Sequence, residues 1–354
     1  MAKKSFGIIG AVNRLLKKIY VVVDGVYRKV TKIYVVVDGV YRLAWKSGAN
    51  FIFVQNDTFD ATAYYTDDGI AFETIGTTSF GSSSGAQGVC VAGDYLWMSG
   101  HSYIVRMSLK DGTTTQMRPL YDLIGGTSGY HNYTDIIEVN GRVIAGVNDS
   151  YSASTTKGSY VVYSDDNGAT WKHSALTTSA TGTSWIAYLG GYYYVLTTNR
   201  HVFYSSDLVT WDFVTVLSSS HTVYGMAVFK ERLIIASKTD SKTYIGYSAV
   251  KPANTLSFTS KQVASTSIAL NRPKVANNTL FIMESTYQGN VMCMSDVTSS
   301  DITQIKIGEV LDDIAYKDGV YYLGGNTLRY GSDLNNLTEN SNMAGVRYII
   351  EMGD

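Results

Sequence analysis

The chain has 354 residues, of which 45% are hydrophobic, 12% aromatic and 17% charged, and its formal net charge at pH 7 is −1. This composition excludes an intrinsically disordered chain and predicts a globular protein with a large buried core. Tyr, Val, Ile and Thr are abundant and only 3 residues are Pro, so β-strands are favoured over helices and the expected fold class is all-β.

The small net charge conceals an asymmetry along the chain. Residues 1–50 carry ten basic and two acidic side chains, whereas the rest of the chain carries 19 basic and 28 acidic side chains. A basic segment of this kind is suited to an acidic protein surface, to nucleic acid or to an anionic membrane. The charge of the segment alone does not distinguish among these three kinds of partner.

The first 18 residues, MAKKSFGIIGAVNRLLKK, place apolar side chains on one face of a short amphipathic helix over residues 8–16. Asn13 and Arg14 interrupt the apolar stretch and no small-residue cleavage pattern follows, so no signal peptide is expected. No apolar run approaches the roughly 20 residues that span a bilayer, so no membrane insertion is expected either.

The sequence KIYVVVDGVYR then occurs twice, at residues 18–28 and 32–42. Asp-Gly between β-branched runs is the strongest short-range signal for a two-residue hairpin turn, so two hairpins are predicted. Because the period of fourteen is even, the second copy repeats one surface on the same face of any continuous sheet. The register of the first hairpin is expected to pair these residues: Val22 with Tyr27, Tyr20 with Lys29, and Val21 with Arg28.

These hairpins carry apolar residues on both faces, and an isolated two-stranded hairpin is marginal in water. Two arrangements stay open: a sandwich between the body and another subunit, or a simple meander packed on the chain's own body. The first arrangement makes residues 1–49 an anchoring segment. Its predicted anchoring residues are Tyr20, Tyr27, Arg28, Lys29, Tyr34, Tyr41 and Arg42.

Residues 50–354 repeat at a longer period. The plainest marker is YSDDNGATW at 163–171, and weaker copies recur along the chain at separations of 36 to 56 residues. A second set of turns, such as IEVNGRVIA and AYKDGVYYL, interleaves with the markers and places a hairpin between two apolar strands. The small residues that begin the markers are Thr66, Ser108, Ser164, Ser205, Ser248, Ser295 and Gly331.

Four strands in each unit of roughly 40 to 50 residues indicate a β-propeller. Six units are visible between residues 86 and 340. The C-terminal GVRYIIEMGD is expected to supply the inner strand of a seventh blade, whose other three strands come from the segment that begins NFIFVQND. Seven four-stranded blades are therefore predicted, with six or eight as alternatives.

The pattern Ser-x-Asp-x-Gly-x-Thr-Trp in the plainest marker resembles the Asp-box of sialidase-type β-propellers. The resemblance implies that the aspartate bonds nearby backbone N–H groups, that the Trp packs into the blade, and that the markers lie opposite the active site of those enzymes. They are then fold residues. The residues that the resemblance makes structural are Ser164, Asp166, Gly168, Trp171, Asp207 and Trp211.

A sialidase-like enzyme would also need an arginine triad, a Tyr–Glu pair and an acidic proton donor at the propeller axis. The NRPKV segment around Arg272 resembles such a motif only weakly. The five His show no metal-ligand spacing, so neither catalytic residues nor a metal or other cofactor is expected. Glycoside hydrolysis stays an alternative, because two of the many Asp residues are able to meet in three dimensions.

Binding is better supported, because the connections opposite the markers are long, polar and rich in Tyr, Ser, Thr and Gly. They span residues 76–87, 121–134, 148–158 and 218–225. Tyr offers rigid contact area with little entropy to lose, as in antibody paratopes. The predicted ligand-binding residues are Tyr121, Tyr130, His131, Tyr133, Tyr151, His221 and Tyr224.

The tandem KIYVVVDGVYR followed by LAWKSG resembles the N-terminal segments of virion proteins of phages that infect gut-dwelling Firmicutes. The resemblance implies a virion protein, assembled in the host cytoplasm into a symmetric particle, that binds other virion proteins through residues 1–49. The propeller would then recognise a glycan or protein on the host surface. A purely structural decoration or tail-tip subunit is the alternative, and nucleic-acid binding is weaker because no recognition helix or stacking platform is present.

Overall fold

The computed structural model divides the chain into two compact units, Met1–Asn50 with Met352–Asp354, and Phe51–Glu351. The structure describes residues 51–57, 59–80, 85–124, 131–149, 158–176, 182–250, 256–265, 268–285 and 289–352, without the side chain of residue 184, and the backbone of residues 19–23, 26–30, 32–37 and 40–46. The helix predicted over residues 8–16 lies outside these ranges.

The N-terminal unit contains two separate two-stranded sheets. One pairs β1 (Ile19–Val23) with β2 (Val26–Val30), and the other pairs β3 (Lys32–Val37) with β4 (Val40–Lys46). The three predicted residue pairs of the first hairpin are confirmed. The second hairpin has a register shift between Ile33 and Tyr34, and the two copies do not join into one continuous sheet.

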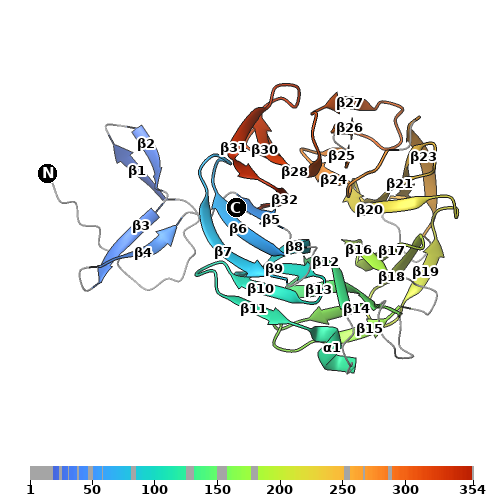
Figure 1. The fold of residues 1–354 in the computed structure, drawn as a ribbon, viewed down its shortest axis with the longest axis horizontal. Coiled ribbons are helices and arrows are strands. Elements are labelled where there is room, and N and C mark those ends of the chain that lie inside the picture. Colours follow the sequence, from blue (N-terminus) through green and yellow to red (C-terminus); the bar gives the residue numbers. More distant parts are fainter. Residues whose placement is uncertain are drawn as a thin grey trace. The chain divides into compact units, whose positions relative to one another are not determined.

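The unit Phe51–Glu351 is a β-propeller of seven four-stranded antiparallel blades, as predicted (Figure 1). Blade 1 consists of β32 (Val346–Glu351), β5 (Phe51–Asn56), β6 (Asp60–Thr66) and β7 (Glu73–Ser79). Blade 2 consists of β8 (Ala86–Ala92), β9 (Tyr95–Gly100), β10 (Ile104–Ser108) and β11 (Thr114–Met117). Blade 3 consists of β12 (His131–Val139), β13 (Arg142–Asp149), β14 (Gly158–Ser164) and β15 (Lys172–Ala175).

The other four blades follow in chain order. Blade 4 consists of β16 (Thr183–Leu189), β17 (Tyr192–Thr197), β18 (His201–Ser205) and β19 (Asp212–Thr215). Blade 5 consists of β20 (Thr222–Phe229), β21 (Arg232–Lys238), β22 (Thr243–Ser248) and β23 (Phe258–Ala264). Blade 6 consists of β24 (Lys274–Ala276), β25 (Thr279–Met283), β26 (Asn290–Met294) and β27 (Thr303–Lys306). Blade 7 consists of β28 (Leu311–Lys317), β29 (Val320–Gly325), β30 (Thr327–Gly331) and β31 (Thr338–Ala344).

Blade 1 closes the ring, because its inner strand β32 comes from the C-terminal end of the chain and pairs with β5 near the start of the propeller. The inner strands of the blades surround the centre of the ring in Figure 1. Joining the two ends of a propeller in one sheet satisfies their backbone hydrogen bonds and leaves no open edge inside the ring.

Burial follows the position of each strand within its blade. The second strands, such as β9, β13 and β17, are apolar and almost wholly buried, because neighbouring blades cover both of their faces. Hydrophobic clusters therefore lie between successive blades, for example around Trp97 and Tyr133 between blades 2 and 3. The outer strands β15 and β27 are mostly polar and largely exposed, which suits edge strands that must not pair with other chains. The outer strand β19 is largely exposed as well but contains Phe213 and Val214.

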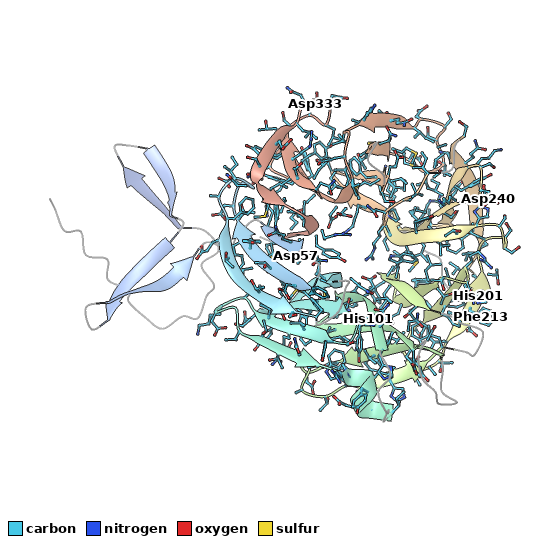
Figure 2. All side chains as sticks on the ribbon, viewed as in Figure 1. Asp57, His101, His201, Phe213, Asp240 and Asp333 are labelled. Carbon is cyan, nitrogen blue, oxygen red and sulfur yellow. The ribbon has the colours of Figure 1, made fainter. Side chains whose placement is uncertain are left out.

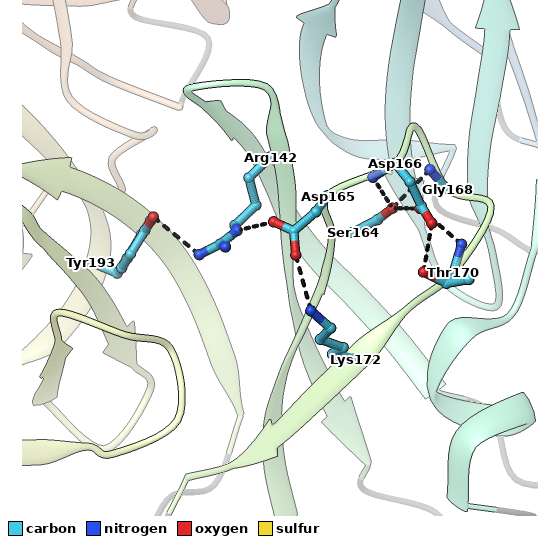
Figure 3. A network of polar contacts seen from close by, with 8 residues as sticks. All are labelled: Arg142, Ser164, Asp165, Asp166, Gly168, Thr170, Lys172 and Tyr193. Atoms are coloured by element: carbon cyan, nitrogen blue, oxygen red, sulfur yellow. Dashed lines mark hydrogen bonds and ion pairs between the residues drawn. The ribbon is translucent and has the colours of Figure 1, made fainter.

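Each small residue predicted to begin a marker ends, or directly follows, the third strand of its blade. The turn after β14 shows the bonding (Figure 3). The carboxylate of Asp166 accepts hydrogen bonds from the backbone N–H of Thr170 at 2.8 Å and from the Thr170 hydroxyl at 2.6 Å. Ser164 Oγ accepts from the N–H of Gly168 at 2.8 Å and donates to Asp166 Oδ1.

Aspartates in the corresponding turns of five other blades also accept backbone N–H bonds, at Asp68, Asp111, Asp207, Asp296 and Asp333. We call these six connections the aspartate turns. In the Asp166 turn a glycine is needed, because Gly168 has φ +80° and a Cβ there would lie 2.7 Å from the Trp97 ring.

Two tryptophans follow the aspartate turns of blades 3 and 4. Trp171 packs edge-on against Trp97 with ring centroids 6.1 Å apart, between blades 2 and 3. The Trp211 indole N–H donates to Ser174 Oγ at 2.9 Å, which links blade 4 to blade 3. Arg142, which contacts Asp165 and the Tyr193 hydroxyl, adds a polar link between the same two blades (Figure 3).

Candidate functional site

The antiparallel order of each blade gives the propeller two distinct ends. The aspartate turns and the hairpins between first and second strands lie at one end, which we call the turn face. The connections between second and third strands, and those from one blade to the next, lie at the other end, which we call the loop face. The inner strands run from the loop face to the turn face.

Several residues predicted in loop-face connections belong to regular elements instead. α1 (Pro119–Ile124) occupies the start of the 121–134 segment, which was expected to be a loop, and His131 and Tyr133 lie in β12. Tyr224 lies in β20, and His221 directly precedes that strand. Tyr130 and Tyr151 lie outside the described residues.

The structure brings together only some of the predicted ligand-binding residues. The rings of Tyr121 and His131 are 6.4 Å apart. Tyr133 belongs to the same region but is fully buried, and its hydroxyl accepts a hydrogen bond from the backbone N–H of Leu120 at 3.2 Å. A ligand contact by Tyr133 stays a prediction; in this structure its buried side chain holds α1 against β12.

His221 and Tyr224 lie two blades away, in blade 5. The ring of His221 is 4.9 Å from that of Tyr244, and its Nδ1 is 3.1 Å from Ser237 Oγ. Tyr224 is half-buried with the ammonium group of Lys238 5.5 Å from its ring. These two residues therefore lie apart from Tyr121 and His131.

The group around Tyr121 includes residues that the sequence did not single out. The guanidinium of Arg118 lies 4.4 Å from the centroid of the Tyr103 ring and 5.9 Å from that of the Tyr121 ring. Arg118 also donates a hydrogen bond to the Tyr103 hydroxyl. Arg118 is exposed, and both tyrosines are half-buried. We call Tyr103, Arg118, Tyr121, His131 and Asp149 the α1 cluster.

His131 and Asp149 form the buried floor of the α1 cluster. They lie opposite each other on β12 and β13, and His131 Nδ1 is 3.8 Å from Asp149 Oδ1. The exposed fractions of these two residues are 6% and 2%. Within the described part of the chain, neither ring nitrogen of His131 and neither carboxylate oxygen of Asp149 has a hydrogen-bond partner. A buried polar group without a partner is costly, so such a pair is a candidate for ligand contact.

A second polar group lies near the axis, where the first halves of the inner strands approach one another. Arg272, just before β24, donates to Asp135 Oδ1 at 3.0 Å, to the Met226 carbonyl at 3.1 Å and to the Ile186 carbonyl at 3.3 Å. These partners belong to blades 3, 5 and 4, so one side chain from blade 6 ties three other blades together. We call Asp135, Arg272, Lys274, Asp313 and Tyr348 the axial cluster.

The two aspartates of the axial cluster occupy equivalent positions. A bulge directly precedes each one in its inner strand, and each carboxylate accepts the N–H of the following residue. Each carboxylate also accepts an N–H from the next blade: Asp135 from Ile186 at 2.9 Å and Asp313 from Ile349 at 3.0 Å. Lys274 lies 2.9 Å from Asp313. The bulges thus turn carboxylates toward the neighbouring blade, a common use of such irregularities.

Glycine is required beside one of these carboxylates. A Cβ at Gly88 would lie 2.8 Å from Asp135 Oδ1 and 2.8 Å from the backbone nitrogen of Ile136. Blade 2 therefore approaches blade 3 more closely here than a side chain would permit.

Asp312 and Arg347 lie next to the axial cluster. Burial raises the pKa of Asp312, and the guanidinium of Arg347, 3.6 Å away, opposes that rise. The Tyr348 hydroxyl donates to the Ala86 carbonyl at 3.1 Å, and burial followed by the charge of Asp135 raises the pKa of the phenol. Most hydrogen-bonding capacity near the axis is thus used between blades.

The remaining predictions concern the N-terminal unit and metals. The predicted anchoring residues, from Tyr20 to Arg42, lie where the structure describes at most the backbone, so their role stays a prediction. In the described residues, no group of three or more His, Cys, Asp or Glu side chains is placed to hold a metal ion. Nor does the described part contain a helix long and apolar enough to span a bilayer.

Comparison with protein-family models and with curated proteins found no match. Solved structures share the fold at low sequence identity. A functionally unknown protein from Desulfotomaculum acetoxidans aligns with a TM-score of 0.61 at 9% identity, over 85% of this chain and 98% of that one. Streptogramin B lyase aligns at 0.54 and 12%, over 73% and 83%, and BamB from Moraxella catarrhalis at 0.52 and 11%, over 77% and 76%. At these identities the similarity shows the β-propeller fold alone.

Proposed function

We propose that the chain is a recognition protein of a phage virion. In this proposal residues 1–49 attach it to another virion protein, and the loop face of the propeller binds a glycan or protein on the host surface. The observation that carries the recognition role is the α1 cluster. In it, half-buried Tyr103 and Tyr121 and an exposed Arg118 lie near a buried His–Asp pair that has no hydrogen-bond partner among the described residues.

Physical chemistry favours ligand contact at this cluster. Tyrosine rings present flat, rigid surfaces that bind sugar rings or peptide side chains with little loss of entropy. Within the ranges that the structure describes, the imidazole and the carboxylate have no hydrogen-bond partner, and a ligand hydroxyl or amide would supply one. Polar groups that remain unpaired without the correct ligand give a site strong discrimination.

The virion part of the proposal rests on the sequence. It draws on the tandem KIYVVVDGVYR, on its resemblance to leaders of phage virion proteins, and on the basic charge of residues 1–50 beside an acidic body. Opposite charge of this kind favours docking of the leader on an acidic partner.

The structural neighbours are compatible with binding but do not identify a ligand. One of them, YCF48, was solved with a D1 peptide bound, and it aligns with a TM-score of 0.51 at 12% identity over 70% of this chain and 77% of that one. Another, streptogramin B lyase, is by its name an enzyme. The same fold thus occurs in a peptide-bound protein and in an enzyme, so the function of this chain has to be argued from the residues of its site.

Glycoside hydrolysis is the second candidate, because Arg272, Tyr348 and two aspartates do lie near the axis. Their bonding argues against it. The Arg272 guanidinium already donates to Asp135 and to two carbonyls, so it is not arranged to hold a substrate carboxylate. The raised pKa of Tyr348 disfavours the phenolate that a tyrosine nucleophile needs.

The test is binding of the full-length chain to candidate host cells and to an array of glycans. Arg118→Ala and Tyr121→Ala are expected to weaken saturable binding at least about tenfold, as loss of a contact worth ~1.4 kcal/mol would. The matched control is the arginine–tyrosine stack on the turn face of the same blade, where Arg106 lies 4.6 Å from the Tyr95 ring. Tyr95→Ala and Arg106→Ala should leave binding unchanged.

Two results would count against this function. Equal losses in the control variants would place the ligand elsewhere or reveal a general folding defect. No binding by the full-length chain to any host cell or glycan would favour the structural alternative, a decoration or tail-tip subunit. Release of reducing sugar from the same glycans, abolished by Asp312→Asn, would support the hydrolase instead.

A further inference from the structure

The His131–Asp149 pair joins the two strand ends at the loop face of blade 3. His131 is the first residue of β12, and Asp149 is the last residue of β13. Their side chains face each other at 3.8 Å, too far for a hydrogen bond, and both are buried. The imidazole and the carboxylate can therefore form an ion pair only when a proton binds to His131.

The two protonation states of His131 have different consequences. A neutral imidazole leaves the Asp149 carboxylate without an ionic partner. A protonated imidazole would donate Nδ1–H to the carboxylate as a charge-assisted hydrogen bond of roughly 2.7–2.9 Å, so the 3.8 Å gap would close. Protonation therefore joins the ends of β12 and β13 and uses the polar atoms that a ligand would otherwise bind.

The charged and titratable groups around His131 determine the proton affinity of its imidazole. Burial lowers the pKa of His131 below its ordinary value of 6.5, the Asp149 carboxylate opposes this, and the Arg118 guanidinium near α1 adds to it. Tyr160 on β14 pairs with Val147, two residues before Asp149, and burial followed by the charge of Asp149 raises the pKa of its phenol. Tyr121, half-buried on α1, completes the surroundings.

We propose that His131 and Asp149 form a proton-operated latch at the buried floor of the α1 cluster. It is open at neutral pH, where the pair is available to a ligand. It closes on acidification, when the imidazolium binds Asp149 and repels Arg118 from its stack on Tyr103 and Tyr121. The ligand-release role of the latch rests on the proposed recognition function, whereas the latch itself requires no ligand.

The molecule contains a matched control in His221. It also lies at the loop face, and burial and the charge of Arg200 lower its pKa in the same direction. Its Nδ1 lies 3.1 Å from the hydroxyl of Ser237, and no carboxylate contributes to its shift. His221 should therefore titrate without closing any latch.

The first experiment follows the imidazole and tyrosine ring signals of the full-length protein by NMR between pH 8 and 4.5. The Tyr103 and Tyr121 signals should shift with the same midpoint as His131, below 6.5. Asp149→Asn should lower the His131 midpoint by about 1 unit, because the carboxylate no longer stabilises the imidazolium. The His221 midpoint should not change. The proposed latch would be refuted by an unchanged His131 midpoint in Asp149→Asn, or by tyrosine signals that do not shift with the His131 titration.

The second experiment measures ligand affinity over the same pH range. The wild-type affinity should fall at least about tenfold over the two units below the His131 midpoint, since each unit adds up to a factor of ten. His131→Gln should abolish this dependence and His221→Gln should retain it, provided that both variants melt like the wild type at pH 7.5. Binding with no pH dependence would refute the release role and leave the recognition function standing. NMR coupling with no binding at any pH would sustain the latch and refute the recognition function.

Discussion

At the scale of single residues, the aspartate turns show how one side chain replaces several backbone hydrogen bonds. Hydrogen bonds from Thr170 and Ser164 lower the pKa of Asp166 to about 2 from 3.8. The ionised form accepts these bonds best, so the carboxylate contributes stability above pH 3.8, and this contribution is lost as the pH falls through about 2. Hydrogen bonds lower the pKa of Asp207 in the equivalent turn of blade 4 as well.

Asp166→Asn is therefore expected to lower the melting temperature at pH 7, with the difference from wild type shrinking as the pH falls from 4 toward 2. Thermal unfolding followed by circular dichroism at several pH values measures this. Asp240, an exposed aspartate at the rim of the ring (Figure 2), is the control, and Asp240→Asn should give a difference that is small throughout. A constant deficit for Asp166→Asn down to pH 2 would show that its charge is not what the turn uses.

The Arg272–Asp135 pair joins blade 6 to blade 3. Asp135 is 2% exposed, so removal of its partner leaves a buried carboxylate held only by backbone N–H groups. Arg272→Ala is expected to reduce the free energy of unfolding by about 2–4 kcal/mol, toward the lower end because the arginine side chain is 30% exposed. Chemical denaturation measures the loss.

A double-mutant cycle separates the ion pair from the carbonyl contacts of Arg272. Adding Asp135→Asn to Arg272→Ala should cost little more than Arg272→Ala alone, because the charge that lost its partner is then absent. Additive losses would mean that the two side chains act independently and that the ring is held by other contacts.

At the scale of elements, one hairpin between a first and a second strand has a strained backbone that other residues would relieve. The turn between β20 and β21 places Lys230 and Glu231 at φ +46° and +56°, where most side chains are disfavoured. The equivalent turn in blade 3 uses Asn140 and Gly141, the residues that such turns prefer.

Replacing the pair by the blade 3 residues, Lys230→Asn with Glu231→Gly, should raise the free energy of unfolding by about 1 kcal/mol through relief of this strain. Chemical denaturation of the double variant measures the gain. The reverse exchange in blade 3, Asn140→Lys with Gly141→Glu, should lower stability by a similar amount. A loss in blade 5 would indicate that contacts of the two side chains outweigh the backbone strain.

Single elements also show where sequence patterns were sufficient to predict the structure. The period-two strands and the Asp-Gly, Asn-Gly and Gly-Gly turns predicted the hairpins of the blades, because these signals act between residues close in the chain. Helix α1 was not predicted, although Pro119 at its first position is a common helix start. Six residues are too few for a helical hydrophobic pattern, and packing against β12 stabilises the helix instead.

At the scale of the whole molecule, ring closure and the N-terminal unit should contribute very differently to stability. Deletion of residues 346–354 removes β32, which exposes the inner edge of β5 and opens the ring. The propeller should then lose its cooperative thermal transition. Deletion of residues 1–49 removes only the other compact unit, so the propeller transition should shift by less than about 2 °C.

Differential scanning calorimetry of the two truncated chains distinguishes these outcomes. A large shift on deletion of residues 1–49 would mean that the hairpins stabilise the propeller, as in the meander packed on its own body. A retained transition without β32 would mean that blade 1 is complete with three strands.

The sequence by itself determined the all-β class, the number of blades, the closing C-terminal strand and the positions of the aspartate turns. These features depend on short-range patterns that recur along the chain. Only the tertiary structure decided which polar residues meet. Arg272 and Asp135 are separated by 137 positions, and Arg118, His131 and Asp149 come together only when α1 packs against blade 3. Such contacts follow from closure of the ring, which brings the loop-face ends of distant strands together, and no local pattern encodes them.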